Sequence, residues 1–105
     1  MSLLTDVLLA IKESNLSRAQ LEEFEQTFTV LYSEYMMRIA VLQKAESLYF
    51  GSMEQQHPEL PDVKIKRMWR VTDDGLELRQ KETEVKVIAK NLSSIKSRIF
   101  QTPNY

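Results

Sequence analysis

The chain has 105 residues, of which 43% are apolar and 28% are charged, and its formal net charge is −1. This length predicts one small domain, and this composition is typical of a globular chain and excludes a disordered one. The near-zero net charge gives no general attraction for nucleic acids or membranes, so any such affinity must be local; the absence of cysteine excludes disulfides and thiolate catalysis.

Residues 3–13 are expected to form a short amphipathic helix, because Leu4, Leu8 and Ile11 recur at helical spacing. The segment has no basic start and no small-residue cleavage site, and it carries Asp6, so it does not resemble a signal peptide. No stretch approaches the roughly 18 apolar residues that a membrane-spanning helix needs. We therefore expect a cytoplasmic location, which is the host cytoplasm if the chain is of phage origin, and no membrane partner.

Residues 17–50 are expected to form one long helix of about 50 Å. Its start is marked by a capping box from Ser17 to Gln20, across which Leu16 and Leu21 are placed as a hydrophobic staple. Apolar side chains then recur at alternating steps of three and four, with one interruption at Arg38. These positions are Leu21, Phe24, Phe28, Leu31, Tyr35, Leu42, Ala45 and Tyr49, and a second flank adds Val30, Tyr32, Met37, Ile39, Val41 and Leu48.

The apolar surface of this helix is larger than the rest of a compact chain of this length is expected to cover. The sequence therefore predicts a homo-oligomer, in which other copies cover part of the helix. The residues expected at that interface come from the long helix and from the C-terminal helix, and they are Phe24, Phe28, Leu31, Tyr35, Ile39, Leu92, Ile95 and Ile99.

Residues 51–62 are expected to form a loop, because glycine, proline and polar residues dominate them. Residues 63–80 are expected to form a β-hairpin. Apolar residues alternate with mostly basic ones over 63–71, only Arg67 departs from the alternation, and Asp74-Gly75 is a strong signal for a hairpin turn. A competing interpretation starts a helix at Asp73, but it is less favoured because Gly75 would then lie in the first helical turn.

Residues 82–100 are expected to form the last helix, and residues 101–105 a tail that contains Pro103. The apolar stripe of this helix consists of Val85, Ile88, Leu92, Ile95 and Ile99. We expect it to pack antiparallel against the long helix, with the hairpin at the far end of the pair. The predicted fold is therefore a mainly α single domain, 1–105, with a short N-terminal helix and one β-hairpin.

Catalysis is not expected. The chain has a single histidine, His57, in a polar segment, and no cysteine. The serines have no neighbouring base that would activate them, and two glycines are too few for a glycine-rich phosphate loop. The sequence therefore predicts a protein that is not an enzyme and has no catalytic residues, no metal site and no cofactor.

The segment KIKRMWRV, residues 64–71, concentrates positive charge and holds the only tryptophan of the chain. In one interpretation its cations neutralise the phosphates of a single strand while the Trp69 indole stacks on a base for about 1–3 kcal/mol. In the other, Trp69 is buried and the lysines only face water; the spacing favours this one slightly, because Trp69 lies opposite Lys64 and Lys66 on a strand. The candidate nucleic-acid-binding residues here are Lys64, Lys66, Arg67, Trp69 and Arg70.

Four short segments, in order, resemble the UvsY family of recombination mediator proteins from T-even-type bacteriophages. They are LYSEY at residues 31–35, KAESLYFGS at 44–52, RMWRVTDDGLELR at 67–79 and IKSRIF at 95–100. The order and coarse spacing hold over roughly residues 20–100, and the middle of the chain is shorter than in the family.

The resemblance implies a small helical oligomer that binds single-stranded DNA and has no catalytic activity. It implies two protein partners, a RecA-type recombinase and the single-stranded-DNA-binding protein. The family helps the recombinase to load onto DNA that this binding protein coats. Lys44 carries over from the basic Lys-Ala-Arg motif of the family, whereas Glu46 replaces its arginine. The cluster over 64–70 would supply the lost charge, and an oligomer would repeat that cluster and add avidity.

Two other classes of function remain open at this stage. A non-enzymatic helical adaptor, or a small phage inhibitor of a host protein, would use the basic segment to bind an acidic protein surface. A structural chaperone would form oligomers and have no affinity for DNA at any salt concentration.

Overall fold

The computed structural model describes residues 16–101 and shows three α-helices there, with no strand in that part of the chain. Helix α2 spans Arg18–Gln56, α3 spans Asp62–Arg70, and α4 spans Asp73–Gln101. The expected helix over 3–13 and the tail beyond Gln101 lie outside the described residues. The prediction of a mainly α chain is confirmed, and the β-hairpin is wrong.

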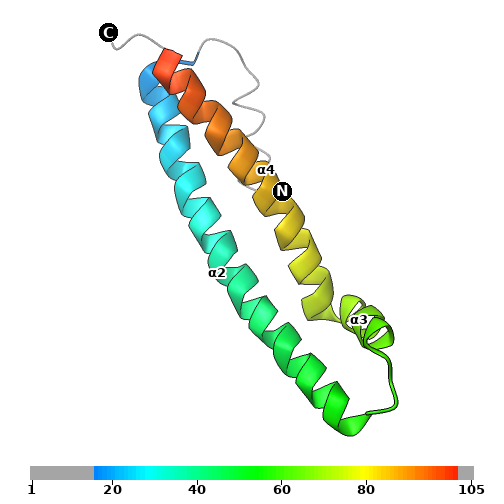
Figure 1. The fold of residues 1–105 in the computed structure, drawn as a ribbon. Coiled ribbons are helices and arrows are strands. Elements are labelled where there is room, and N and C mark those ends of the chain that lie inside the picture. Colours follow the sequence, from blue (N-terminus) through cyan, green and yellow to red (C-terminus); the bar gives the residue numbers. More distant parts are fainter. Residues whose placement is uncertain (1–15, 102–105) are drawn as a thin grey trace.

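Helices α2 and α4 pack antiparallel along most of their length (Figure 1). Leu21 and Phe28, near the start of α2, share a cluster with Ile95 and Ile88 from the later part of α4. Further along α2, Leu42 shares a second cluster with Leu78 from the first part of α4. The result is an elongated molecule of 66 × 20 × 18 Å, with α3 lying across one end of the helix pair.

The start of α2 is the capping box that the sequence predicts. The Gln20 backbone N–H donates to Ser17 Oγ at 3.2 Å, and the Ser17 backbone N–H donates to Gln20 Oε1 at 2.9 Å. The predicted end at residue 50 is wrong, because α2 continues through Gly51 to Gln56. Glycine weakens a helix interior by only about 0.5–1 kcal/mol relative to alanine, whereas Pro58 cannot continue a helix, so the loop is confined to residues 57–61.

The segment expected to be the first hairpin strand is α3. Ile65 and Trp69, four residues apart, are buried side by side on one helix face at 0% and 5% exposure. Val63 and Val71, which a strand would place on that same face, are exposed at 62% and 75%. Arg67, which interrupts the alternation, fits the helix. In a helix Ile65 and Trp69, at positions i and i+4, share the buried face, whereas position i+2 points to the opposite side.

The segment expected to be the hairpin turn is the corner between α3 and α4. Thr72 caps α4, since its Oγ1 accepts from the Gly75 N–H at 3.0 Å and its hydroxyl donates to the Trp69 carbonyl at 2.6 Å. A Cβ at position 75 would lie 2.0 Å from the Trp69 carbonyl oxygen. Glycine is therefore needed here for close approach of two helices, and the competing interpretation, a helix from Asp73, is the observed one.

The residues expected at an interface between copies pack inside the single chain instead. Phe28, Ile39 and Ile95 are buried, and the others are half-buried; these others are Phe24, Leu31, Tyr35, Leu92 and Ile99. The reason is that α4 begins at Asp73 and not at 82, so it is long enough to cover one face of α2. Other copies are therefore not needed to cover this face of α2.

Candidate nucleic-acid interface

Helix α3 carries four exposed cations against one carboxylate, Asp62, within nine residues. The cations are Lys64, Lys66, Arg67 and Arg70. Two of them, Arg67 and Arg70, lie in the last turn, where positive charge is favoured by the helix dipole. Because Ile65 and Trp69 anchor the opposite face, the cations occupy the solvent side of a fixed helix.

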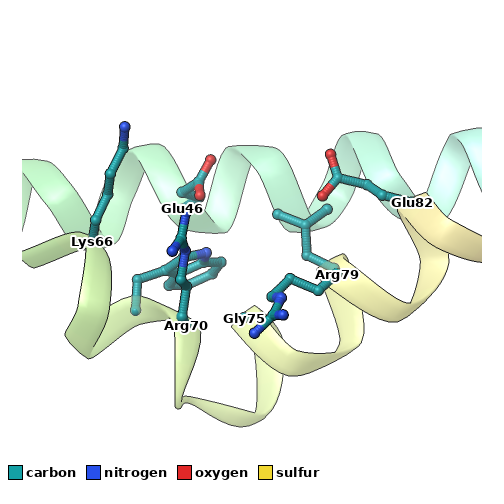
Figure 2. A pocket seen from close by; sticks show the side chains of 8 residues that line it. Glu46, Lys66, Arg70, Gly75, Arg79 and Glu82 are labelled. Atoms are coloured by element: carbon teal, nitrogen blue, oxygen red, sulfur yellow. The ribbon is translucent and has the colours of Figure 1, made fainter.

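The cations of α3 border two different hollows. Lys66 and Arg70, four residues apart, line one of about 300 Å³ between the three helices (Figure 2). Lys64 and Arg67 line the other, of about 520 Å³, on the outer side of α3.

The inner hollow holds charges of both signs. Its wall from α4 adds Arg79 and Glu82, and its wall from α2 adds Glu46. Trp69, Gly75 and Leu78 complete the lining. A phosphate entering the hollow would meet three cations but also two carboxylates, so the strongest attraction for a polyanion lies on the outer side of α3.

Trp69 belongs to the core. Its side chain is 5% exposed, its ring centroid lies 5.4 Å from that of Tyr49, and it packs in one cluster with Leu42 and Leu78. The interpretation in which Trp69 is buried is therefore the observed one, and the indole is not placed to stack on a base. The cations remain exposed, as both interpretations require.

Lys44 lies on a different side of the molecule from α3. Leu42 and Glu46 face the other helices, and a residue two positions from each of them points about 200° away from that face. Lys44 is exposed there. The structure therefore groups the four cations of α3 and does not bring Lys44 to them within one chain.

Arg79 and Glu82 were not anticipated as part of this site. The hairpin interpretation placed Arg79 on a second strand, whereas α4 brings both residues to the wall beside α3. A signal was present: a helix beginning after Thr72 puts Gly75, Arg79 and Glu82 on one face, at steps of four and three.

Glu77, another acidic residue of α4, forms an ion pair with Arg38 of α2. Arg38 Nε and Nη2 donate to the two carboxylate oxygens of Glu77 at 2.7 Å and 2.6 Å. These hydrogen bonds hold the pKa of Glu77 below its usual value. Glu77 is thus committed to Arg38 and does not compete for the cations of α3.

Within residues 16–101, acidic and histidine side chains form no group of three or more that would hold a metal ion. No helix in the same stretch has the length and apolarity needed to cross a membrane. Comparison with known proteins adds no assignment, since no family model, no curated protein and no solved structure matches the chain.

Proposed function

We propose that this protein is a non-enzymatic accessory protein that binds single-stranded DNA through α3. The observation that supports the proposal most is the presence of four exposed cations on a nine-residue helix whose other face is fixed in the core. Although the net charge of the chain is −1, the charges are distributed unevenly, and α3 has the largest local excess of positive charge among the described helices.

Binding would be electrostatic and tolerant of sequence. Cations that neutralise phosphates release counterions, and for a single strand the logarithm of the affinity falls by about 0.7 per neutralised phosphate per logarithm of salt concentration. With Trp69 in the core, base stacking on the indole is not part of the binding mode. We therefore expect modest affinity per chain and a steep salt dependence.

The biological role proposed from the resemblance is that of a recombination mediator. Such a protein helps to load a RecA-type recombinase onto single-stranded DNA that is coated by the single-stranded-DNA-binding protein. A site that contacts phosphates and leaves bases free suits this role, because the recombinase can still reach the bases.

Substitution of Lys64, Lys66 and Arg70 by alanine tests the assignment. We expect at least a tenfold loss of affinity for a labelled oligothymidylate, measured by fluorescence anisotropy at low salt, because three phosphate contacts are removed. The matched control replaces three exposed lysines of α4, Lys86, Lys90 and Lys96, and changes the net charge equally. Equal losses in the two variants would contradict a site on α3; the fluorescence of the buried Trp69 reports whether both variants are folded.

A second candidate function, binding of an acidic protein, is favoured by the outer hollow of α3. Its lining is largely apolar, from Pro61, Val63, Met68 and Val71, beside Lys64 and Arg67. Poly-L-glutamate and oligothymidylate distinguish the two functions in a competition assay. Binding to a protein surface predicts that both polyanions bind weakly and that single-stranded and double-stranded DNA bind alike.

A further inference from the structure

Helix α2 has an apolar stripe that neither α3 nor α4 covers. Its side chains are Val30, Met37, Val41 and Leu48, and they are exposed at 58%, 71%, 57% and 67%. The steps between them are seven, four and seven residues, which keep all four on one side of a helix. This stripe lies away from the face that meets α4, where Phe28, Ile39 and Leu42 are buried.

Two charged residues complete the stripe. Glu34 and Lys44 fill the gaps in the heptad spacing, and both are exposed. The stripe then reads apolar, acidic, apolar, apolar, basic, apolar over residues 30–48. Its midpoint is Ile39, and each position has a counterpart at the same distance on the other side of that residue. Glu34 and Lys44, which are such counterparts, have opposite charges.

We propose that the stripe binds a second copy of this chain, with the two α2 helices antiparallel and a twofold axis near Ile39. In this register Val30 faces the partner's Leu48 and Met37 faces the partner's Val41. Glu34 faces the partner's Lys44, and because of the twofold axis the dimer contains two such ion pairs. Val30, Met37 and Lys44 occupy one of the two interface positions of the heptad, and Glu34, Val41 and Leu48 occupy the other. Each contact in this register joins one position to the other, as in antiparallel coiled coils.

Charge complementarity selects the second copy and its orientation. A parallel pairing would place Glu34 against the partner's Glu34 and Lys44 against the partner's Lys44, and both contacts are repulsive. The antiparallel pairing converts all four charges into two attractive pairs. The stripe is about 27 Å long, at 1.5 Å per residue, so it offers five turns of helix to a partner of the same length.

Gly51 supports the same register. A Cβ at this position would meet nothing within 4 Å, so packing within the chain does not explain a glycine in the interior of α2. Gly51 is the next seam position after Leu48, and its counterpart across Ile39 is Thr27. A glycine there would let the backbones of two α2 helices approach closely at each end of the interface.

Charge exchange tests the proposal on the full chain by sedimentation equilibrium. Glu34→Lys and Lys44→Glu should each weaken the dimer at least tenfold, because each creates two like-charge contacts. A mixture of the two single variants, and the double variant Glu34→Lys/Lys44→Glu, should regain the affinity of the unchanged chain, since both restore opposite charges. A parallel dimer predicts instead that neither single variant weakens association, since each keeps two like-charge contacts, and that only the mixture of the two associates more tightly than the unchanged chain; that pattern would overturn the proposal.

Disulfide trapping gives a second test, and the absence of native cysteine makes it free of background. Met37→Cys mixed with Val41→Cys should form a cross-linked heterodimer under mild oxidation, because these positions face one another. The control pair, Val30→Cys with Val41→Cys, is out of register and should cross-link far less. Equal cross-linking of the two mixtures would overturn the register, and a chain that stays monomeric at all concentrations would overturn the dimer and assign the stripe to residues 1–15 or another protein.

Discussion

Gly75 fixes the corner between α3 and α4. The Trp69 carbonyl oxygen occupies the space that a side chain at position 75 would need, and the carbonyl carbon and the Arg70 Cα lie within 2.8 Å and 3.1 Å of that Cβ. All three are backbone atoms, so they can yield only if the two helices move apart. The position of the basic helix therefore depends on one residue of α4.

Gly75→Ala is expected to destabilise the protein by about 1–3 kcal/mol, the usual cost of forcing extra atoms into a packed site. Gly51→Ala is the matched control. Since a Cβ there meets nothing within the chain, alanine should stabilise the monomer by about 0.5–1 kcal/mol, when unfolding is measured at a chain concentration too low for the proposed dimer to form. Urea unfolding followed by Trp69 fluorescence measures both, and a Gly75→Ala variant as stable as the unchanged chain would contradict the close approach.

Glu46 offsets part of the positive charge of the inner hollow. It stands where the resemblance places an arginine, and it shares the hollow with Lys66, Arg70 and Arg79. Glu46→Arg replaces a repulsive charge with an attractive one. We expect tighter binding of oligothymidylate by about tenfold at low salt, and a salt dependence steeper by about one phosphate contact. Glu23→Arg, exposed near the start of α2 at the end away from α3, is the control; an equal gain would mean that only net charge matters.

Among the elements, α2 is predicted most accurately and α3 least. The capping box of Ser17 and the heptad spacing that follows it are local signals, and the structure follows both. The sequence of α3 fits two periods, because residues 63, 65, 69 and 71 alternate while residues 65 and 69 are also one helical turn apart. Tertiary contacts of Trp69 with α2 and α4 decide between them, and a local pattern does not contain those contacts.

The candidate site could be predicted only in part for the same reason. The charge cluster of residues 64–70 is visible in the sequence, and so is the ambiguity of Trp69. The walls of the inner hollow, Glu46 and Glu82, come from residues far apart along the chain. They become neighbours only because α4 begins at Asp73. The Asp74-Gly75 pair favours a hairpin turn at that place, so the sequence does not predict this start.

The ion pair of Arg38 with Glu77 predicts how the contact between α2 and α4 depends on pH. Because Arg38 lowers the pKa of Glu77 in the folded chain, the pair stabilises the fold above the ordinary pKa of a glutamate. That stabilisation is lost as the pH falls through the lowered pKa. The difference in unfolding free energy between the unchanged chain and Glu77→Gln should therefore be full at neutral pH and shrink as the pH falls below the ordinary pKa of a glutamate. A difference that does not change with pH would contradict an ionic role for Glu77.

At the scale of the whole molecule, the proposed dimer places its two copies of α3 on opposite halves of a rod. Glu46, which lies beside Lys66 and Arg70, is 7 residues beyond the proposed axis, so the two copies of this site are about 21 Å apart along the rod at 1.5 Å per residue. A single strand that reached both basic helices would be held at two points, and its second contact would be intramolecular.

This arrangement predicts that affinity depends on the length of the oligonucleotide. An oligonucleotide must be longer than the stretch that one α3 contacts before it can span the two sites. Oligothymidylates shorter than this should bind with the affinity of one α3, and longer ones should bind at least tenfold more tightly. The step should disappear in the Glu34→Lys variant, which weakens the dimer; a smooth increase with length in both chains would contradict two separated sites.

The salt dependence of oligothymidylate affinity tests the central claim most directly. For the unchanged chain at a length that reaches one site, we expect the logarithm of the affinity to fall with a slope of about −2 to −3, the contribution of three to four phosphate contacts. In the variant with alanine at Lys64, Lys66 and Arg70 the slope should be no steeper than about −0.7, the contribution of the one contact left to Arg67. Absence of binding at low salt, or the same slope in both chains, would contradict the assignment of α3 as the DNA-binding element.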